Sequence, residues 1–253
     1  MQIEINIPAP CEKALEILER HGYEAYLVGG CVRDSILGRE PGDWDICTNA
    51  LPEEMIAAFA DYRLVLNGLK HGTVTVIIMH TAIEITTYRI DGEYEDNRHP
   101  KEVTFTSDLA LDLSRRDFTI NALAYNQGKG VVDCFGGLED LANGVIKAVG
   151  DPYKRFHEDG LRILRAVRFA CVLGFTYDER TKDAVRDCNY LLRNIATERI
   201  QVELNKILLS PNVRQGLEDM YQLGLYSYFL PEMCHTYGFA QHNPFNCYDV
   251  FGH

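Results

Sequence analysis

The sequence lacks the long apolar stretches that mark membrane proteins and the leader that marks secreted ones. Its longest purely apolar runs cover only a few residues, such as Val76–Met79, far short of the roughly 20 needed to cross a bilayer. The start, Met1–Glu4, has neither a basic n-region nor an apolar h-region. We therefore expect a soluble, cytoplasmic protein with no membrane partner.

Closely spaced cysteine pairs are also missing, because none of the eight cysteines belongs to a C-x-x-C pair. Several lie in apolar segments, where a free cysteine behaves as a small hydrophobic residue, so reduced structural thiols are favoured over zinc or disulfides. Positive charge is scarce, and the net charge of −12 argues against a generic basic nucleic-acid binder. The locally basic segment 154–168 still permits a restricted RNA-binding patch.

Repeats, low-complexity segments and long linkers are absent, so the 253 residues suit one large domain or two small ones. The predicted elements are a helix over 10–21, strands over 23–28, 44–48, 73–79 and 82–88, a polar loop over 90–107, a helical stretch over 108–125, short strands over 131–133 and 145–149, and helices after 150. A mixed α/β front half and a helical back half predict two regions with a boundary near 150.

The most informative stretch joins a glycine turn, an arginine and two aspartates. Gly29 and Gly30 precede Arg33 at the opening of a short helix, and such a turn offers backbone N–H groups to phosphate. Asp43 and Asp45 are spaced i, i+2 on a predicted strand, so their carboxylates share one face. They repel each other unless a cation such as Mg²⁺ lies between them.

Glu84 is a candidate third carboxylate on a neighbouring predicted strand. It lies between Ile83 and Ile85 and points away from them, so it could face the same side as the two aspartates. The alternative is an exposed strand glutamate. Carboxylates arranged in this way serve in-line phosphoryl transfer, so the pattern predicts a metal-dependent site that acts on a nucleoside triphosphate.

A second cluster of polar residues follows in the segment 113–122. Arg115 and Arg116 are predicted at the head of a helix, where the dipole favours acids, a conflict that a bound anion would relieve. Asn121 lies four residues after Asp117, hence on the same helix face, where both could hydrogen-bond a ribose. A surface helix with ion pairs is the alternative, and it would be favoured if this segment stood alone.

An arginine stripe marks the predicted helix near residue 160. Arg162, Arg165 and Arg168 recur every third residue, and Asp159 lies three residues before Arg162, close enough to pair with it. A carboxylate that accepts from an exocyclic amino group, beside a guanidinium that donates to a ring nitrogen, fits cytosine and adenine but not uracil or guanine. The pair could therefore select C and A, although such a stripe is most often a solvated face.

Three motifs, in this order, resemble those of bacterial class II tRNA nucleotidyltransferases and their poly(A) polymerase relatives, in the DNA polymerase β superfamily. They are G-G-x-V-R-D followed by D-x-D over 29–45, R-R-D-F-T-x-N-A-x-A over 115–124, and E-D-x-x-R-x-x-R-A-x-R-F over 158–169. The resemblance implies an α+β fold. Its parts would be a polymerase β-like head with a small mixed sheet over 1–150, an all-helical neck with the base-reading motif over 151–211, and a partial helical body over 212–253.

The resemblance also implies roles for the motif residues. Asp43 and Asp45 would bind the metal ions, Mg²⁺ in this family, and Glu84 joins them as a catalytic candidate. The residues expected to bind the nucleotide are Gly29, Gly30, Arg33, Arg116, Asp117, Asn121, Asp159, Arg162, Arg165 and Arg168. CTP and ATP would be the substrates for building the 3′-terminal CCA of tRNA, and the 90–107 loop matches the flexible loop of CCA- and A-adding members.

Other functions fit parts of the same pattern. A poly(A) polymerase or an A-adding tRNA nucleotidyltransferase would use the same nucleotide pocket. A non-catalytic RNA- or nucleotide-binding module would keep the fold, but binding alone would not need paired aspartates. The sequence leaves the oligomeric state open.

The end of the chain departs from the family pattern. Family members continue into body and tail regions, whereas this chain ends in a segment that resembles the start of an HD phosphohydrolase domain, with His253 as its first candidate metal ligand. The remaining HD ligands are absent, so HD chemistry is not expected. The resemblance therefore implies a fragment or a truncated sequence.

Overall fold

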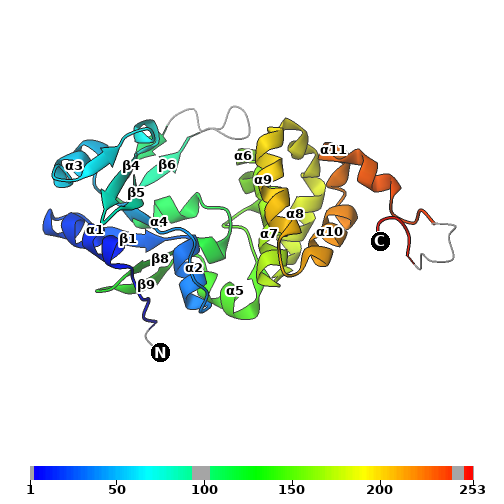
Figure 1. The fold of residues 1–253 in the computed structure, drawn as a ribbon, viewed down its shortest axis with the longest axis horizontal. Helices are drawn as coiled ribbons and strands as arrows, with labels where there is room; N and C mark the ends of the chain where they lie inside the picture. The colour runs from blue at the N-terminus through cyan, green and yellow to red at the C-terminus, as the bar shows by residue number, and fades with distance from the viewer. Residues whose placement is uncertain (1–2, 93–102, 241–247, 253) are drawn as a thin grey trace. The chain divides into compact units, whose positions relative to one another are not determined.

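The computed structural model describes residues 3–92, 103–240 and 248–252, and it divides the chain into two compact units (Figure 1). Of the described residues, unit 1 contains 3–92, 103–143 and 147–150, and unit 2 contains 144–146, 151–240 and 248–252. Most of the predicted 90–107 loop, and His253, lie outside the described residues. Within the described part of the chain, no helix has both the length and the apolar character needed to cross a membrane.

Unit 1 is a mixed sheet with short helices. Its elements are α1 (Ala9–Arg20), β1 (Ala25–Val28), α2 (Gly30–Ile36), β2 (Asp45–Thr48), α3 (Pro52–Ala58), β3 (Arg63–Val65), the 3₁₀ turn η1 (Leu69–His71), β4 (Thr73–Ile78), β5 (Thr81–Thr87), β6 (Arg89–Asp91), β7 (Val103–Phe105), α4 (Leu109–Ser114), the 3₁₀ turn η2 (Thr119–Asn121), β8 (Leu123–Asn126), β9 (Gly130–Asp133) and α5 (Gly137–Asn143).

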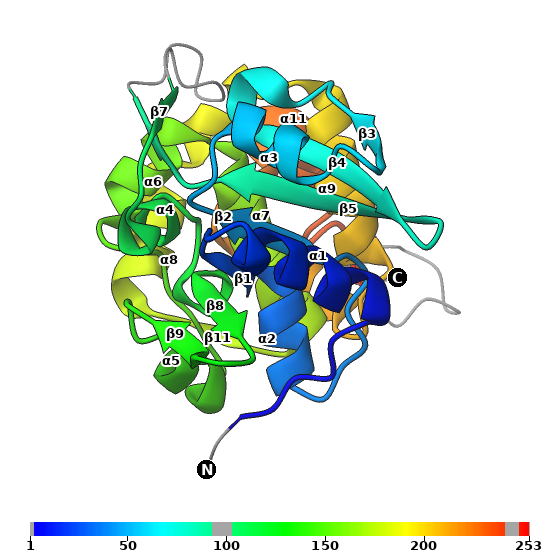
Figure 2. The same ribbon diagram turned by 90° about the vertical axis from the view of Figure 1, so that its left-hand side faces the viewer.

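Seven of these strands form one sheet in the order β3-β4-β5-β2-β1-β8-β9 (Figure 2). The β2–β5 pair is parallel, and the other described pairs of this sheet are antiparallel. The parallel register sets Asp45 opposite Glu84. Because α1 and α3 pack against these strands, the buried faces of β4 and β5 carry Val74, Val76 and Ile85, as the alternating sequence predicts.

The β4–β5 hairpin turns at Met79 and His80, which have φ angles of 50° and 63°. Positive φ at both central residues is typical of the two-residue type I′ turn that suits the twist of adjacent strands. The sequence predicted the hairpin with its turn at His80-Thr81, and the observed turn lies one residue earlier.

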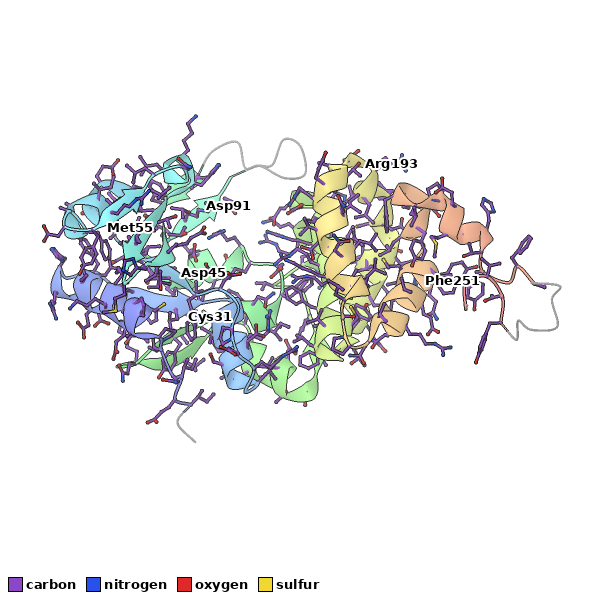
Figure 3. All side chains as sticks on the ribbon, viewed as in Figure 1. Cys31, Asp45, Met55, Asp91, Arg193 and Phe251 are labelled. Carbon is purple, nitrogen blue, oxygen red and sulfur yellow. The ribbon has the colours of Figure 1, made fainter. Side chains whose placement is uncertain are left out.

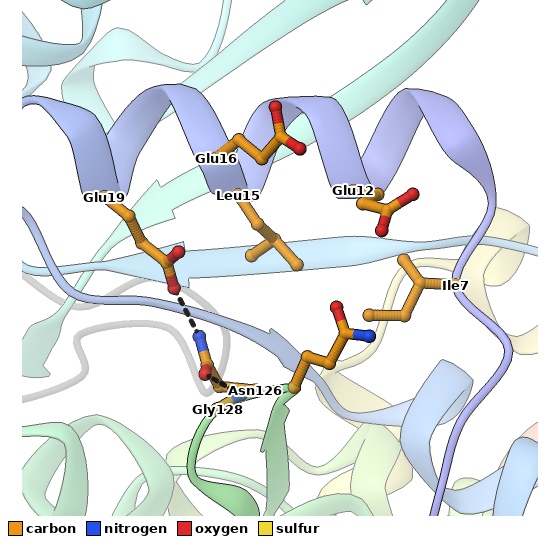
Figure 4. A pocket seen from close by; sticks show the side chains of 8 residues that line it. Ile7, Glu12, Leu15, Glu16, Glu19, Asn126 and Gly128 are labelled. Carbon is orange, nitrogen blue, oxygen red and sulfur yellow. Dashed lines mark hydrogen bonds between the residues drawn. The ribbon is translucent and has the colours of Figure 1, made fainter.

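Helix α1 is held against the end of β8 by Asn126. The side-chain amide of Asn126 donates to Glu19 Oε1 at 2.7 Å and to the carbonyl of Ala25 at 2.9 Å. Glu19 and Asn126 border a cavity of about 340 Å³ whose α1 wall also carries Glu12 and Glu16 (Figure 4). The buried amide is fully used by these bonds, so it ties the helix to the sheet.

The predicted helix over 108–125 is wrong over most of its length. Helix α4 ends at Ser114, a 3₁₀ turn follows, and Leu123–Asn126 form strand β8, which is buried between β1 and β9. An apolar run as short as 122–125 does not reveal helix or strand by its periodicity. These residues form a strand because they pair with β1 on one side and β9 on the other.

Two further predictions differ from the structure at their edges. Both ends of the predicted 90–107 loop form strands, because β6 pairs with β7 from Arg89↔Phe105 to Asp91↔Val103. The predicted strand over 145–149 is limited to β10 (Val145–Ile146), which pairs in parallel with β11 (Thr176–Tyr177) in unit 2. Its remaining residues return to unit 1, where the N–H of Val149 donates to the carbonyl of Asp117.

The other named elements in the described part of unit 2 are helices and 3₁₀ turns. Its elements are α6 (Pro152–Glu158), α7 (Leu161–Leu173), α8 (Glu179–Asp187), the 3₁₀ turn η3 (Asn189–Asn194), α9 (Thr197–Leu208), α10 (Val213–Gln222), α11 (Tyr226–Phe229) and the 3₁₀ turn η4 (Pro231–His235). Helix α7 packs against both α9 and α10. A Cβ at Gly216 of α10 would lie 2.7 Å from Ile207 and 3.3 Å from Cys171, so glycine allows these helices to approach closely.

The cysteines of the described residues are all free, and five of them are buried. Burial raises the pKa of the Cys11 thiol to about 11. They behave as small core residues, as the sequence predicted.

Candidate active site

Three carboxylates gather where β2 and β5 run side by side. Asp45 begins β2, Glu84 is its register partner on β5, and Asp43 lies two residues before Asp45. All three line one cavity of about 710 Å³. The sequence proposal that Glu84 faces the aspartates therefore agrees with this geometry.

The charged residues that line this cavity are all acidic, and Arg116 compensates their negative charge only in part. The pKa of Asp45, labelled in Figure 3, is raised by burial of the carboxyl group and by the neighbouring Glu84 and Asp43. Arg116 acts in the opposite direction and lowers it. A cation placed among these groups would favour the ionised forms. Within the described residues, no group of three or more His, Cys, Asp or Glu side chains is arranged so that it could hold a metal ion without further ligands.

The first and second motifs meet through a buried hydrogen-bond chain. Arg33 on α2 donates two bonds to Asp34, at 2.9 and 2.8 Å, and a third to Asn121 Oδ1 at 2.5 Å, although Asn121 is 88 residues away. Asn121 in turn donates to Asp117 Oδ1 at 3.0 Å. Arg33, Asp117 and Asn121 are all more than nine-tenths buried, so these hydrogen bonds fix the positions of the three side chains.

Gly29 makes room for Arg116. Its φ of +82° lies in the left-handed region, and a Cβ there would come within 2.9 Å of Arg116 Nη1. The other end of the same guanidinium is 3.8 Å from Asp112 Oδ2. Arg116 Nε is buried and makes no hydrogen bond within the described residues. The guanidinium thus lies against the glycine turn with hydrogen-bonding capacity left over.

The sequence predicted that the two arginines of the second motif lie at the head of a helix. The structure shows that this prediction is wrong. Arg115 caps the C-terminal end of α4 and Arg116 follows it, where the dipole favours cations. The predicted conflict therefore does not exist. Asp117 and Asn121 do not share an α-helical face either, and their contact runs across the turn into η2.

Sequence reasoning missed the acid that holds these arginines. Asp112 is fully buried, and its Oδ1 accepts two bonds from Arg115, at 3.0 and 2.9 Å. The signal was available, because Asp112 precedes Arg115 and Arg116 by three and four residues, the spacing of neighbours on one helix face.

In unit 2, the side chains of Asp159 and Arg162 are each held by a further charged residue. The carboxylate of Asp159 accepts two hydrogen bonds from Arg199 of α9, at 3.1 and 2.8 Å. Arg162 donates to Glu158 Oε2 at 2.8 Å and to the carbonyl of Arg155 at 3.2 Å. The predicted pairing of Asp159 with Arg162 stays a prediction, and the two hydrogen bonds from Arg199 are an addition that the sequence did not suggest.

Arg165 and Arg168 are held by another residue of α9. Glu203 Oε2 lies 2.6 Å from Arg168 Nε, and its Oε1 lies 3.9 Å from Arg165 Nη1. The Arg168 guanidinium also stacks 3.9 Å from the centre of the Phe169 ring. No motif singled out Arg199 or Glu203. Glu203 could have been found as the one charge in a buried helical stripe, between Ile200 and Ile207.

The fold and the polar residues described above together indicate a class of protein. A mixed sheet that presents acidic residues beside a buried arginine–asparagine network, followed in the chain by a helical unit with clamped arginines, is a nucleotidyltransferase architecture. Residues 25–147 match the poly A polymerase head domain, and residues 174–236 match the probable RNA and SrmB-binding site of polymerase A. The chain belongs to the class II tRNA nucleotidyltransferase family, as its motifs predicted.

Two curated relatives are CCA-adding enzymes. The CCA-adding enzyme of Anoxybacillus flavithermus is 49% identical over 219 residues, which cover 87% of this chain and 54% of that protein. The CCA-adding enzyme of Limosilactobacillus reuteri is 50% identical over 219 residues, with the same coverage of 87% and 54%. The chain thus spans about half the length of the curated relatives it matches.

Solved structures agree with the fold. The Bacillus stearothermophilus CCA-adding enzyme in complex with CTP aligns with a TM-score of 0.80 and 41% identity, over 88% of this chain and 54% of that one. The Thermotoga maritima CCA-adding enzyme complexed with tRNA aligns with a TM-score of 0.76 and 28% identity, over 90% and 54%. The predicted α+β class and polymerase β-like head are therefore confirmed.

Proposed function

We propose that this chain carries the catalytic part of an enzyme that transfers CMP and AMP from CTP and ATP to the 3′ end of tRNA, and so builds or repairs the CCA terminus. The observation that carries the proposal is the carboxylate set in one cavity, with Asp45 opposite Glu84 and Arg116 acting on Asp45. The relatives described above are all named CCA-adding enzymes, and these names support the proposal.

The donor set fits a hard divalent cation. Nucleotidyltransferases of this family use divalent metal ions, and we assign Mg²⁺ to Asp43 and Asp45. Mg²⁺ is usually held by one or two carboxylates together with substrate phosphates and water, so a site need not contain three protein ligands. When bound, the metal ions would lower the pKa of the attacking 3′-hydroxyl and neutralise charge on the leaving pyrophosphate.

The remaining residues of unit 1 would position the triphosphate. Arg33 is fixed by Asp34 and Asn121, so its guanidinium needs little reorganisation to meet an anion. Arg116, beside the turn of Gly29 and Gly30, would meet the same ligand through donors that the protein leaves unused. Little covalent chemistry is required of such a site, because positioning and charge stabilisation supply most of the rate.

Base selection would fall to unit 2. Asp159 would accept from the exocyclic amino group of cytosine or adenine, and Arg162 would donate to the adjacent ring nitrogen. Each is preset by a neighbour, Arg199 for Asp159 and Glu158 for Arg162. Arg165 and Arg168, both held by Glu203, would contact the phosphates.

A poly(A) polymerase is the second candidate, because residues 25–147 match a domain of that name. To decide, the protein is incubated with Mg²⁺, a tRNA lacking CCA and each labelled NTP, singly and combined, and products are resolved at single-nucleotide length. Addition of C, C and A followed by a stop supports CCA synthesis. A growing A-only ladder indicates a poly(A) polymerase, and a single A added only to tRNA ending in CC indicates an A-adding enzyme.

The matched variants for this assay are Asp43→Asn and Asp61→Asn. Asp61 is an exposed aspartate of unit 1 outside the cavity. Asp43→Asn is expected to abolish all addition, whereas Asp61→Asn is expected to leave it unchanged. Equal products from both variants and the wild type would remove the carboxylate site from the proposal.

A further inference from the structure

Asp112 and Arg116 carry opposite charges and lie close together inside unit 1 without a hydrogen bond between them. Arg116 Nη2 is 3.8 Å from Asp112 Oδ2, which is beyond hydrogen-bonding distance. Asp112 Oδ2 and Arg116 Nε are both buried, and neither has a hydrogen-bond partner among the described residues. Buried polar atoms are normally paired, because an unpaired one is costly. The fold therefore keeps a charged acceptor and a charged donor near each other but not joined.

The carboxylate of Asp112 is anchored through its other oxygen. Oδ1 accepts hydrogen bonds from Arg115 Nε at 3.0 Å, from Arg115 Nη2 at 2.9 Å and from the backbone N–H of Arg89 at 3.2 Å. The side chain of Asp112 is 1% exposed, so solvent weakens these bonds little. Three donors on one oxygen fix the direction of the carboxylate and leave Oδ2 facing Arg116.

Arg116 is restrained by the glycine turn and is attracted by more than one acid. A Cβ at Gly29 would lie 2.9 Å from Arg116 Nη1, so this end of the guanidinium fits only because the turn has no side chain there. The positive charge of Arg116 lowers the pKa of Asp45, so its field reaches the cavity carboxylates as well as Asp112. The side chain remains 21% exposed, which leaves it accessible to a ligand.

We propose that Asp112 is a positioning residue that holds Arg116 by charge alone and so keeps the donors of Arg116 available to the nucleotide. A full hydrogen bond to Oδ2 would occupy one of these donors, whereas a neutral neighbour would leave the guanidinium free to reorient. The anchored carboxylate avoids both. The proposal rests on the proposed function, in which Arg116 meets the triphosphate.

This arrangement has opposite consequences for nucleotide binding and for the chemical step. The negative charge of Asp112 attracts Arg116 and opposes an incoming anion, so it weakens the binding of a triphosphate. The same charge orients the guanidinium before the reaction, so the developing charge of the transition state meets a donor already in place. Loss of the charge should therefore tighten binding and slow addition. A residue needed only for folding would weaken both when altered.

Asp112→Asn preserves the shape of the side chain and removes its charge. We expect the Kd for CTP with Mg²⁺, in the absence of RNA, to fall about fivefold, and kcat for addition of CMP to a tRNA lacking CCA to fall about tenfold. Isothermal titration calorimetry and single-turnover extension measure the two constants. A Kd for CTP that rises or does not change would overturn the proposal.

The matched control is Asp108→Asn on the same helix. Asp108 is exposed and caps the N-terminus of α4 by accepting from the N–H of Ala110. Asparagine caps a helix as well as aspartate does, so this variant removes a negative charge from α4 without loss of the cap. Both constants should stay within about twofold of the wild type. A fall in Kd equal to that of Asp112→Asn would assign the effect to net charge and overturn the positioning role.

Arg115→Lys tests the anchor, with an expected change of opposite sign. Lysine keeps the positive charge but cannot make both bonds that the guanidinium makes to Asp112 Oδ1. The carboxylate can then turn and form a hydrogen bond to Arg116, so the Kd for CTP should rise about fivefold. This variant decides the question if Asp112→Asn does not fold. A lower or unchanged Kd for CTP would overturn the proposal.

An Arg116→Ala background shows whether Asp112 acts through Arg116. In this background Asp112→Asn should change neither the Kd for CTP nor kcat, because the group that it positions is gone. Changes as large as those in the wild-type background would make Asp112 a structural residue and overturn the proposal.

The two proposals fail separately. A wild-type protein that adds nucleotides, while Asp112→Asn binds CTP no more tightly, refutes the positioning role and leaves the proposed function standing. A wild-type protein that binds CTP but adds no nucleotide refutes the proposed function, and the CTP titrations still decide the role of Asp112. A wild-type protein that binds no CTP refutes both.

Discussion

The cavity carboxylates of unit 1 and the motif charges of unit 2 are arranged in opposite ways. In unit 1 the strand register sets Asp45 opposite Glu84, with Asp43 two residues away, and burial together with these two neighbouring carboxylates raises the pKa of Asp45. In unit 2 the motif charges are paired with opposite charges. Glu203 compensates Arg168, and Arg199 compensates Asp159. A site that awaits a cation is left electrostatically incomplete, whereas a site that must present fixed donors and acceptors is compensated in advance.

The sharpest way to test this contrast is to remove one uncompensated charge. Asp45→Asn should lower kcat for nucleotide addition by about a thousandfold, equivalent to about 4 kcal/mol, because a metal-binding carboxylate is lost. The melting temperature should stay equal or rise slightly, since repulsion from Glu84 is relieved. Single-turnover extension and calorimetry measure the two quantities, with Asp61→Asn as the control. A variant that unfolds would show that Asp45 has a structural role instead.

Removing a compensated charge should do the reverse, with the main cost in stability. Glu203→Gln removes the buried carboxylate that faces the partly buried Arg168 and should lower the free energy of unfolding of the helical unit by about 3 kcal/mol. Glu218→Gln breaks the exposed pair with Arg214 and should change it by a few tenths of a kcal/mol. Urea denaturation followed by circular dichroism measures both. Similar values for the two variants would contradict the comparison.

A smaller effect is expected on selectivity when the clamp on Asp159 is removed. Arg199→Ala frees the carboxylate from two hydrogen bonds, so its acceptor geometry is no longer preset. We expect the ratio of kcat/KM for CTP over UTP to fall about tenfold, or about 1.4 kcal/mol. Competition assays measure this ratio, and Arg180→Ala, which removes an exposed arginine of α8, should leave it unchanged. An unchanged ratio for Arg199→Ala would show that the clamp is purely structural.

The smallest expected effect is a pH dependence that belongs to unit 1. Because the pKa of Asp45 is raised in the folded protein, folding favours its protonated form. The stabilisation relative to Asp45→Asn is therefore greatest at low pH and is lost as pH rises from the ordinary carboxyl range through the folded pKa. Without metal, the melting temperature of the wild type should fall below that of the variant by a small margin near pH 7, and Mg²⁺ should restore it. A pH-independent difference would contradict this account.

The sequence predicted the parts of the site that depend on local pattern. The i, i+2 spacing of Asp43 and Asp45 and the alternation around Glu84 were sufficient to place three carboxylates on one side of neighbouring strands. Helix α7 and its arginines followed from apolar periodicity, and the hairpin from two strands separated by a short polar turn. Each of these features is set by residues close together in the chain.

The features that were missed depend on residues far apart. Leu123–Asn126 read as helix because only pairing with β1 and β9 makes them a strand. The partner of Asp159 is Arg199, 40 residues later, chosen by the packing of α7 against α9. Local periodicity contains neither contact. Asp112 is the exception, since its spacing to both arginines was visible in the sequence.

The position of β8 in the sheet has a consequence for the order in which the protein assembles. β1 is among the first strands made, yet one of its two neighbours, β8, is separated from it by almost a hundred residues. The bond from Arg33 to Asn121 closes a loop of comparable length. Such closures are slow and come late. During synthesis, the part of the proposed site that lies in unit 1 should therefore form in one step, after residue 126 has left the ribosome, and no shorter nascent chain should bind a nucleoside triphosphate.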